Sequence, residues 1–146
     1  MVLHEVIRLA PPVGDDFRLC NHDDVLPSGV KIRKKTRMII PNLAIGRDEF
    51  LWKNAESFNP ERWMAYENGV AKPVRRVDEY VHPIFFAGKR LCLGKDMARF
   101  ESIVFMAKIF TKLHVKPLPD QSDEMSSGPV IFRKDGIKCQ IEKRIH

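Results

Sequence analysis

The sequence predicts an α+β fold, mostly helical, formed by residues 1–146 as one domain or as a piece of a larger one. A long helical pattern covers Lys95–Leu113, and short strand-like stretches elsewhere are separated by proline and glycine turns. Hydrophobic residues make up 44% and charged residues 30% of the chain, which is the usual range for a globular protein. We therefore expect helices to carry the packing and the strands to form small hairpins.

The first predicted element is a helix over Leu3–Leu9, where apolar residues recur at helical spacing. Pro11 and Pro12 end it, because proline lacks a backbone donor and restricts the residue before it. No capping residue precedes this helix, and Met1 stands where a first turn should already be formed. We expect the chain to be a fragment or a truncated product.

The next elements are strands over Phe17–Cys20, Val30–Arg33 and Thr36–Ile40. A turn signal at Leu26–Gly29 precedes the basic run Lys31–Arg37, which we interpret as the solvated polar face of a hairpin.

The remaining elements follow in chain order. Residues 42–62 mix short helical turns with irregular chain, and residues 66–78 are polar enough to predict a surface loop. Residues 130–132 and 137–141 predict a hairpin around Asp135-Gly136. The long helix is expected to bury a broad apolar face, formed by Met97, Ala98, Ile103, Val104, Ala107, Ile109, Phe110 and Leu113.

Composition excludes several classes of protein. The formal charge of +6 and a pI of about 9.4 invite a nucleic-acid partner, but no RNP-like, zinc-finger or helix-turn-helix pattern supports one. No run of about 18 apolar residues occurs, so no membrane-spanning helix is predicted. The three cysteines are far apart, odd in number and without a CxxC pair, which disfavours a disulfide framework, structural zinc or an iron–sulfur cluster.

The segment that carries chemistry is Phe85–Gly94, directly before the long helix. A buried cysteine is by itself more often a small hydrophobe than a ligand, but Cys92 lies just before a helix N-terminus, which favours an anion. Gly88 permits a tight turn, and Gly94 leaves room for a flat cofactor. Arg90 offers a forked cation suited to a carboxylate, and Phe85 is placed to shield the sulfur from water.

The order Phe-x-x-Gly-x-Arg-x-Cys-x-Gly in this segment resembles the cysteine-loop signature of the cytochrome P-450 family. The resemblance implies that Cys92 is the axial ligand of a haem b iron and that Arg90 contacts a propionate, while Phe85, Gly88 and Gly94 shape the loop. The sequence departs from the family at Phe86, where a small or polar residue is usual.

Two further segments resemble the same family in the same order. Glu5-Val6-Ile7-Arg8 resembles its Glu-x-x-Arg helix, although an exposed ion pair would have the same spacing. Pro60-Glu61-Arg62 resembles its Pro-Glu-Arg segment, although it could also be a common turn. The resemblance implies that Glu5, Arg8 and Arg62 form a buried triad that holds the cysteine loop.

The resemblance extends over the whole chain as the C-terminal portion of the family's fold. Arg18 falls where many members place a second propionate contact, or it is an exposed strand arginine. Val13 and Gly14 resemble the stretch that lines the substrate pocket. Residues 23–27, 44–47 and 94–98 resemble the branch that hydroxylates fatty acids near the chain end. Cys20 and Cys139 are expected to be structural.

By resemblance, the parent protein is a haem-thiolate monooxygenase of the endoplasmic reticulum membrane, acting on an apolar substrate and anchored by a segment outside this sequence. The family's acid–alcohol oxygen-activating motif is absent, so we expect the chain to be inactive alone. An NADPH-dependent reductase is expected to dock on basic residues of the cysteine side, namely Lys89, Arg90, Lys95 and Arg99, which otherwise form a solvated helix start. Two alternatives stay open: a haem-thiolate enzyme that rearranges peroxides, and a non-enzymatic remnant.

Overall fold

The structure is a computed structural model that describes residues 1–74, 77–126 and 128–145. Its helical elements are, in chain order, α1 (Val2–Leu9), α2 (Asn42–Ile45), the 3-10 turns η1 (Pro60–Trp63), η2 (Pro83–Phe85) and η3 (Gly88–Arg90), and α3 (Lys95–Lys112). The strands pair antiparallel in two-stranded sheets: β1 (Asp16–Leu19) with β4 (Arg37–Ile40), β2 (Asp24–Val25) with β3 (Lys31–Ile32), β5 (Met64–Glu67) with β6 (Val70–Pro73), and β7 (Leu113–Pro117) with β8 (Cys139–Lys143).

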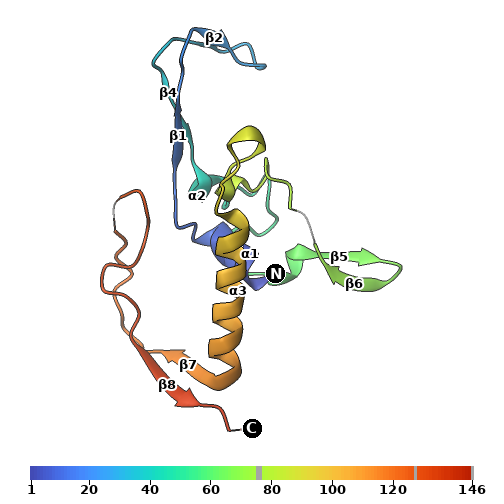
Figure 1. The fold of residues 1–146 in the computed structure, drawn as a ribbon, viewed down its shortest axis with the longest axis vertical. Helices are drawn as coiled ribbons and strands as arrows, with labels where there is room; N and C mark the ends of the chain where they lie inside the picture. Colours follow the sequence, from blue (N-terminus) through green and yellow to red (C-terminus); the bar gives the residue numbers. More distant parts are fainter. Residues whose placement is uncertain (75–76, 127, 146) are drawn as a thin grey trace.

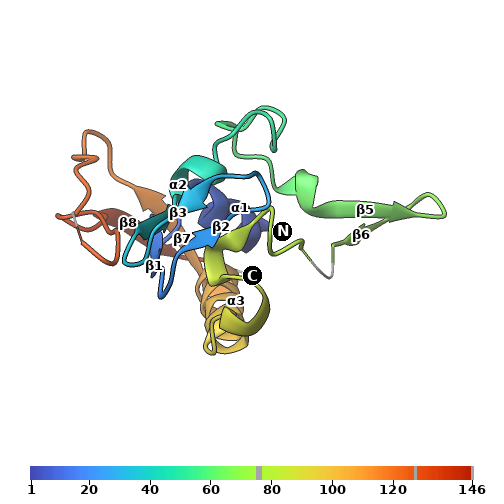
Figure 2. The same ribbon diagram turned by 90° about the horizontal axis from the view of Figure 1, so that it is seen from above.

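The sheets project from a small centre (Figure 1). The centre consists of α1, the elements η1 and α2 that contact it, and the N-terminal half of α3, with the N-terminus beside it. The β1–β4 ribbon and the β2–β3 hairpin form an arm at one end, while β7 and β8 lie at the far end of α3. Figure 2 shows from above that β5 and β6 extend alone to one side. The site is therefore assembled by the few elements that converge at the centre.

Most predicted elements are present where the sequence places them. The α+β class, the first helix, the long helix and the hairpin with the turn at residues 26–29 are confirmed. Gly29 has a φ of 83°, the left-handed conformation that favours glycine in such a turn. None of the described helices is both long and apolar enough to cross a membrane.

Two predictions about elements are wrong. Residues 64–73 form the β5–β6 hairpin instead of belonging to a surface loop; Arg75 and Arg76 of the predicted loop lie outside the described residues. Residues 130–141 do not pair with each other around Asp135-Gly136, because β8 pairs with β7, which starts directly after α3. A strand that pairs with a distant partner looks the same in sequence as one that pairs locally.

The predicted buried face of α3 is also absent, since no residue of α3 is buried. The exposed fractions of Met97, Ile103 and Phe110 are 67%, 54% and 52%. Half-buried side chains such as Arg99, Val104 and Ile109 are spread among exposed ones along the helix, so the described chain covers α3 only in part.

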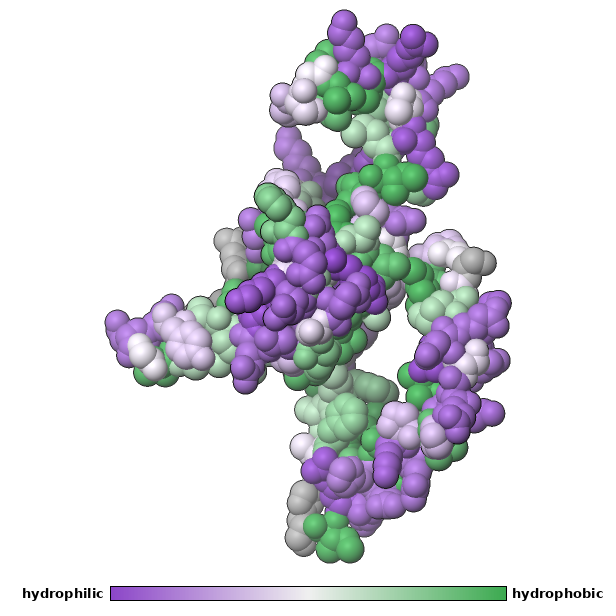
Figure 3. Space-filling model, turned by 180° about the vertical axis from the view of Figure 1, so that it is seen from behind, coloured by the Kyte–Doolittle hydropathy of each residue, from purple (hydrophilic) through white to green (hydrophobic). Residues whose placement is uncertain are grey.

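The molecule has little apolar core, and its buried centre is polar. The buried apolar residues are Ala55, Trp63 and Ile84, whereas Glu5 and Arg8 are completely buried. The accessible surface is 11790 Å², against about 7,700 Å² for a compact monomer of this mass. Figure 3 shows apolar side chains on the surface among the polar ones. Much apolar surface is therefore left uncovered by the described chain.

Candidate functional site: the cysteine loop and its support

A buried ion triad forms the base of the site. Glu5 Oε1 lies 2.7 Å from Arg8 Nη2 and 3.0 Å from Arg62 Nε. Glu5 Oε2 accepts a second hydrogen bond from Arg8, at 2.9 Å, and one from Trp63 Nε1, also at 2.9 Å. The backbone N–H of Asn59 donates to Glu5 Oε1 at 2.9 Å. One carboxylate on α1 thus fixes the turn η1 by side-chain and backbone contacts together.

The environment of Glu5 keeps its carboxylate charged. Burial by itself raises the pKa of Glu5, because it disfavours the charged form. The hydrogen bonds from Arg8, from the Asn59 backbone, from Arg62 and from Trp63 outweigh burial and lower the pKa to about 2. The charged carboxylate therefore balances two buried or half-buried guanidinium groups at neutral pH.

Arg8 also binds the irregular segment between α2 and η1. Its guanidinium donates to the backbone carbonyls of Gly46, of Ala55 at 2.7 Å and of Ser57 at 3.2 Å. A Cβ atom at Gly46 would lie 2.2 Å from the Arg8 carbonyl oxygen, so only glycine fits there. Arg62 donates to the Lys53 carbonyl at 3.0 Å. Segments with no regular secondary structure are thereby held by two arginines.

An aromatic cluster connects this triad to the cysteine loop. The ring of Trp63 lies with its centroid 5.2 Å from His4, 5.3 Å from Trp52 and 5.2 Å from His82. His82 is buried and directly precedes η2, the start of the cysteine loop. Sequence patterns do not reveal this cluster, and its one local signal is the position of Trp63 directly after Arg62.

The two histidines of the cluster are held neutral. Burial lowers the pKa of His82 to about 4, assisted by the charges of His4 and Arg8. Burial and the nearby Arg99 cation likewise lower the pKa of His4 to about 4. His4 Nδ1 and His82 Nε2 are buried without a hydrogen-bond partner among the described residues. These imidazoles act as packed rings at neutral pH.

The cysteine loop runs through two short 3-10 turns to the start of α3. The backbone N–H of Cys92 donates to the Phe85 carbonyl at 2.7 Å, and Leu91 N–H donates to the Gly88 carbonyl at 3.1 Å. Gly88 has a φ of 61°, so this turn depends on glycine. Gly94 is the N-cap of α3, which places Cys92 three positions before Lys95, the first residue of the helix, as the sequence predicts.

The Cys92 thiol is open to a ligand. The residue is exposed, and its sulfur has no hydrogen bond to any part of the chain that the structure describes. A Cβ built on Gly94 would lie 4.0 Å from Cys92 Sγ, with no other neighbour within that distance. Phe85 is half-buried and lines a cavity between α1 and α3. Its shielding of the sulfur from water stays a prediction.

Two arginines at the cysteine loop, one on the loop and one reaching it from β1, have no acidic partner among the described residues. Arg90 is exposed on η3. The Arg18 guanidinium, on strand β1, lies 3.9 Å from the centroid of the Phe86 ring. The structure thus brings Arg18 to the loop from a distant part of the sequence. A free thiol with two unpaired guanidinium groups nearby is a donor set that fits a haem, whose iron takes a thiolate and whose propionates take arginine.

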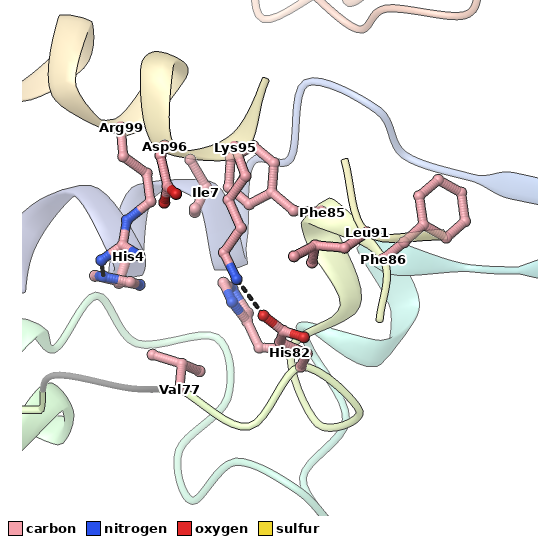
Figure 4. A pocket seen from close by; sticks show the side chains of 11 residues that line it. His4, Ile7, Val77, His82, Phe85, Phe86, Leu91, Lys95, Asp96 and Arg99 are labelled. Carbon is pink, nitrogen blue, oxygen red and sulfur yellow. Dashed lines mark hydrogen bonds and ion pairs between the residues drawn. The ribbon is translucent and has the colours of Figure 1, made fainter. Parts of the chain in front are cut away.

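Behind the loop lies a cavity of about 240 Å³. Figure 4 shows Lys95 and Arg99 of α3 reaching across it toward His82 and His4. Lys95 forms an ion pair with Glu79, and Arg99 Nη2 lies 3.1 Å from His4 Nε2. These two cations are therefore engaged within the chain, while Lys89 and Arg90 are exposed.

The stretch after α1 packs against the C-terminal segment. The Ile131 N–H donates to the Pro12 carbonyl at 2.6 Å, and a Cβ on Gly14 would lie 2.4 Å from the Ile131 side chain. Val13 lines a cavity of about 370 Å³ together with Phe17. Val13 and Gly14 are thus brought to one side of the β1–β4 arm. Cys20 and Cys139 are half-buried free cysteines, and Cys20 Sγ lies 3.5 Å from Met38 Sδ.

Known proteins are similar to this chain in sequence and in fold. Cytochrome P450 94B3 of Arabidopsis thaliana is 32% identical over 146 residues, covering 99% of this chain and 29% of that protein. Cytochrome P450 94A1 of Vicia sativa is 41% identical over 149 residues, covering 97% of this chain and 28% of that protein. The solved structure of retinoic acid-bound cyanobacterial CYP120A1 superposes with a TM-score of 0.80 at 29% identity, covering 98% of this chain and 32% of that one.

The chain therefore spans less than a third of the length of each of these relatives. The model of the family described as "Cytochrome P450" matches residues 1–141, which include the triad, the aromatic cluster and the cysteine loop. This chain belongs to the cytochrome P450 family.

Proposed function

We propose that this chain supplies the cysteine-side half of a haem-thiolate monooxygenase, with Cys92 as the thiolate ligand of haem b. The observation that carries the proposal is the exposed, unpaired Cys92 thiol on a loop fixed by its own backbone N–H and by the N-terminus of α3. The family match supports it. When bound, the haem would supply the oxygen-activating chemistry.

The chain's own residues have distinct roles in this proposal. Cys92 binds the iron as an anion, which the unpaired N–H groups at the start of α3 stabilise. Arg18 and Arg90 bind the propionates, because neither has an acidic partner among the described residues. Gly94 leaves the face beside the sulfur free of a side chain. Glu5, Arg8 and Arg62 hold the segments on which the loop rests.

We propose an apolar substrate for the complete protein, in particular a fatty acid. Support comes from residues 23–27, 44–47 and 94–98, which resemble fatty-acid hydroxylases. Gly46 adds little to this support, because its close approach to the Arg8 carbonyl already requires a glycine there. Membrane association in the endoplasmic reticulum belongs to this proposal as well.

An NADPH-dependent reductase is the proposed partner on the cysteine side. The available cations there are Lys89 and Arg90, since Lys95 and Arg99 already contact Glu79 and His4. Reversing the charge of Lys89 should therefore slow electron transfer at low salt more than reversing Lys95, which would mainly break an internal ion pair. Equal effects of both substitutions would contradict this assignment.

Haem reconstitution tests the proposed ligand directly. The chain is reconstituted with haem, reduced and exposed to carbon monoxide, and the difference spectrum is recorded for the wild type and for Cys92→Ser. We expect a red-shifted thiolate band in the wild type that is lost in the mutant. Cys20→Ser and Cys139→Ser are matched controls and should retain the band. A band that survives Cys92→Ser would refute the assignment.

A further inference from the structure

Phe86 occupies a backbone conformation that its side chain does not favour. Its φ is 61° and its ψ is −176°, a region in which essentially only glycine is found. The turn is closed by the Phe86 N–H, which donates to the Pro83 carbonyl at 2.9 Å. A large residue persists in such a conformation only where surrounding contacts hold it.

The ring of Phe86 has one such contact. It lies away from His4 and His82 (Figure 4), and the Arg18 guanidinium lies 3.9 Å from its centroid. Arg18 is held in turn by its own strand, because its Nη1 donates to the Phe17 carbonyl at 2.8 Å. A guanidinium over an aromatic face at this distance is attractive. Strand β1 is thereby joined to the cysteine loop through two side chains.

This contact bears on the ligand through the backbone. The peptide between Phe85 and Phe86 carries the carbonyl that accepts the Cys92 N–H, at 2.7 Å. Rotation of Phe86 out of its unusual conformation would turn that carbonyl and release the hydrogen bond. The position of the thiol therefore depends on the conformation of Phe86.

We propose that Phe86 and Arg18 act as a clamp that positions the cysteine loop, with Phe86 as a positioning residue for the thiol of Cys92. The clamp explains how this chain carries a phenylalanine at a backbone position suited to a small residue. Only the effect of the clamp on haem binding rests on the proposed function. The contact between Phe86 and Arg18 itself involves no haem.

Hydrogen exchange of the Cys92 amide in the chain without haem tests the clamp. Phe86→Leu and Arg18→Gln should each accelerate exchange by about two- to fivefold, the range expected for an exposed cation–π contact. The double mutant should exchange no faster than either single mutant, since both remove the same contact. Phe86→Tyr keeps the aromatic face and should restore the wild-type rate.

The chain offers a matched control. Arg37 lies 4.3 Å from the Phe17 ring in the same ribbon and, among the described residues, has no hydrogen bond or ion pair to the cysteine loop, so Arg37→Gln should leave Cys92 exchange unchanged. The Asn59 amide, bound to Glu5, reports on the centre and should also be unchanged in every variant. Additive effects in the double mutant, an equal effect of Arg37→Gln, or a parallel rise at Asn59 would each overturn the clamp.

A second measurement of the clamp is the reduced carbon monoxide spectrum of the chain reconstituted with haem. Phe86→Leu should lower the fraction of haem that shows the thiolate band, and Phe86→Tyr should restore it. If the wild type takes up no haem, that failure concerns the proposed function, and the exchange measurement alone decides on the clamp.

Discussion

At the scale of single residues, this protein depends on a few buried charges and rings. Glu5 is completely buried and receives hydrogen bonds from two arginines, one tryptophan and one backbone amide. Such a group stabilises a structure only while all its partners are present, because an unpaired buried charge is costly.

Replacing Glu5 by Gln should therefore destabilise the chain by about 3–5 kcal/mol, since Arg8 would remain buried without a counter-charge. The measurement is urea unfolding followed by tryptophan fluorescence. Glu56→Gln is the control: Glu56 pairs with Arg47 on the surface and should change stability by about 0–1 kcal/mol. Equal losses in both variants would contradict the central role of Glu5.

His82 predicts a loss of stability on mild acidification. Its pKa is lowered to about 4 in the folded chain, against about 6.5 in the unfolded chain. Between these values the unfolded state binds the extra proton, so the free energy of unfolding falls as the pH falls through this window. The slope contributed by one such histidine is at most about 1.4 kcal/mol per pH unit.

Between pH 7 and pH 4, the free energy of unfolding should depend less steeply on pH in His82→Phe than in the wild type. This substitution keeps a ring against Trp63 and removes the titrating imidazole. Exposed His22 provides the control, and His22→Gln should leave the slope as in the wild type. Below about pH 4.3 a further loss is expected as Glu5 takes up its proton, because its pKa is lowered to about 2 in the folded chain.

At the scale of elements, contacts to carbonyl groups decide how α1, α2 and η1 fit together. The sequence predicts α1 and α3 well, since α1 has apolar periodicity and ends before Pro11, and α3 begins directly after Gly94. It cannot predict the path between α2 and η1, because Arg8 and Arg62 fix that path through backbone carbonyls that any residue could offer. It also misplaces the partner of β8, since pairing with β7 depends on where α3 ends.

Gly46→Ala tests the fit of these elements. The new methyl would meet the Arg8 carbonyl oxygen at 2.2 Å, and relieving this overlap should cost about 1–3 kcal/mol. Gly128→Ala is the matched control, because a Cβ there has no neighbour within 4 Å. The check is the urea midpoint of each variant; an unchanged midpoint for Gly46→Ala would show that α1 and α2 can separate without loss.

At the scale of the whole molecule, uncovered apolar surface dominates the expected behaviour. Phe100 and Ile103 of α3 are 70% and 54% exposed, and the arm and the C-terminal segment add further exposed apolar side chains. Water disfavours such surface, so the isolated chain should self-associate.

Sedimentation velocity should show self-association that decreases in the double variant Phe100→Glu and Ile103→Glu. These substitutions should leave the unfolding midpoint nearly unchanged, because neither side chain is buried. Ile84→Glu is the contrasting variant: it places a charge at a buried position and should unfold the centre. If this double variant associated as strongly as the wild type, the surface responsible for self-association would lie outside Phe100 and Ile103.

The sequence by itself determined the family, the helices α1 and α3 and the identity of the candidate ligand, because these depend on residue types at fixed local spacings. Cys92 with Arg90, Gly88 and Gly94 lies within one short loop, and the spacing of Glu5 and Arg8 fits one face of a helix. Only the tertiary structure decided which distant groups meet. It brought Arg62 to Glu5, Trp63 to His82 and Arg18 to Phe86, because such contacts depend on the path of irregular backbone, which local sequence patterns do not encode.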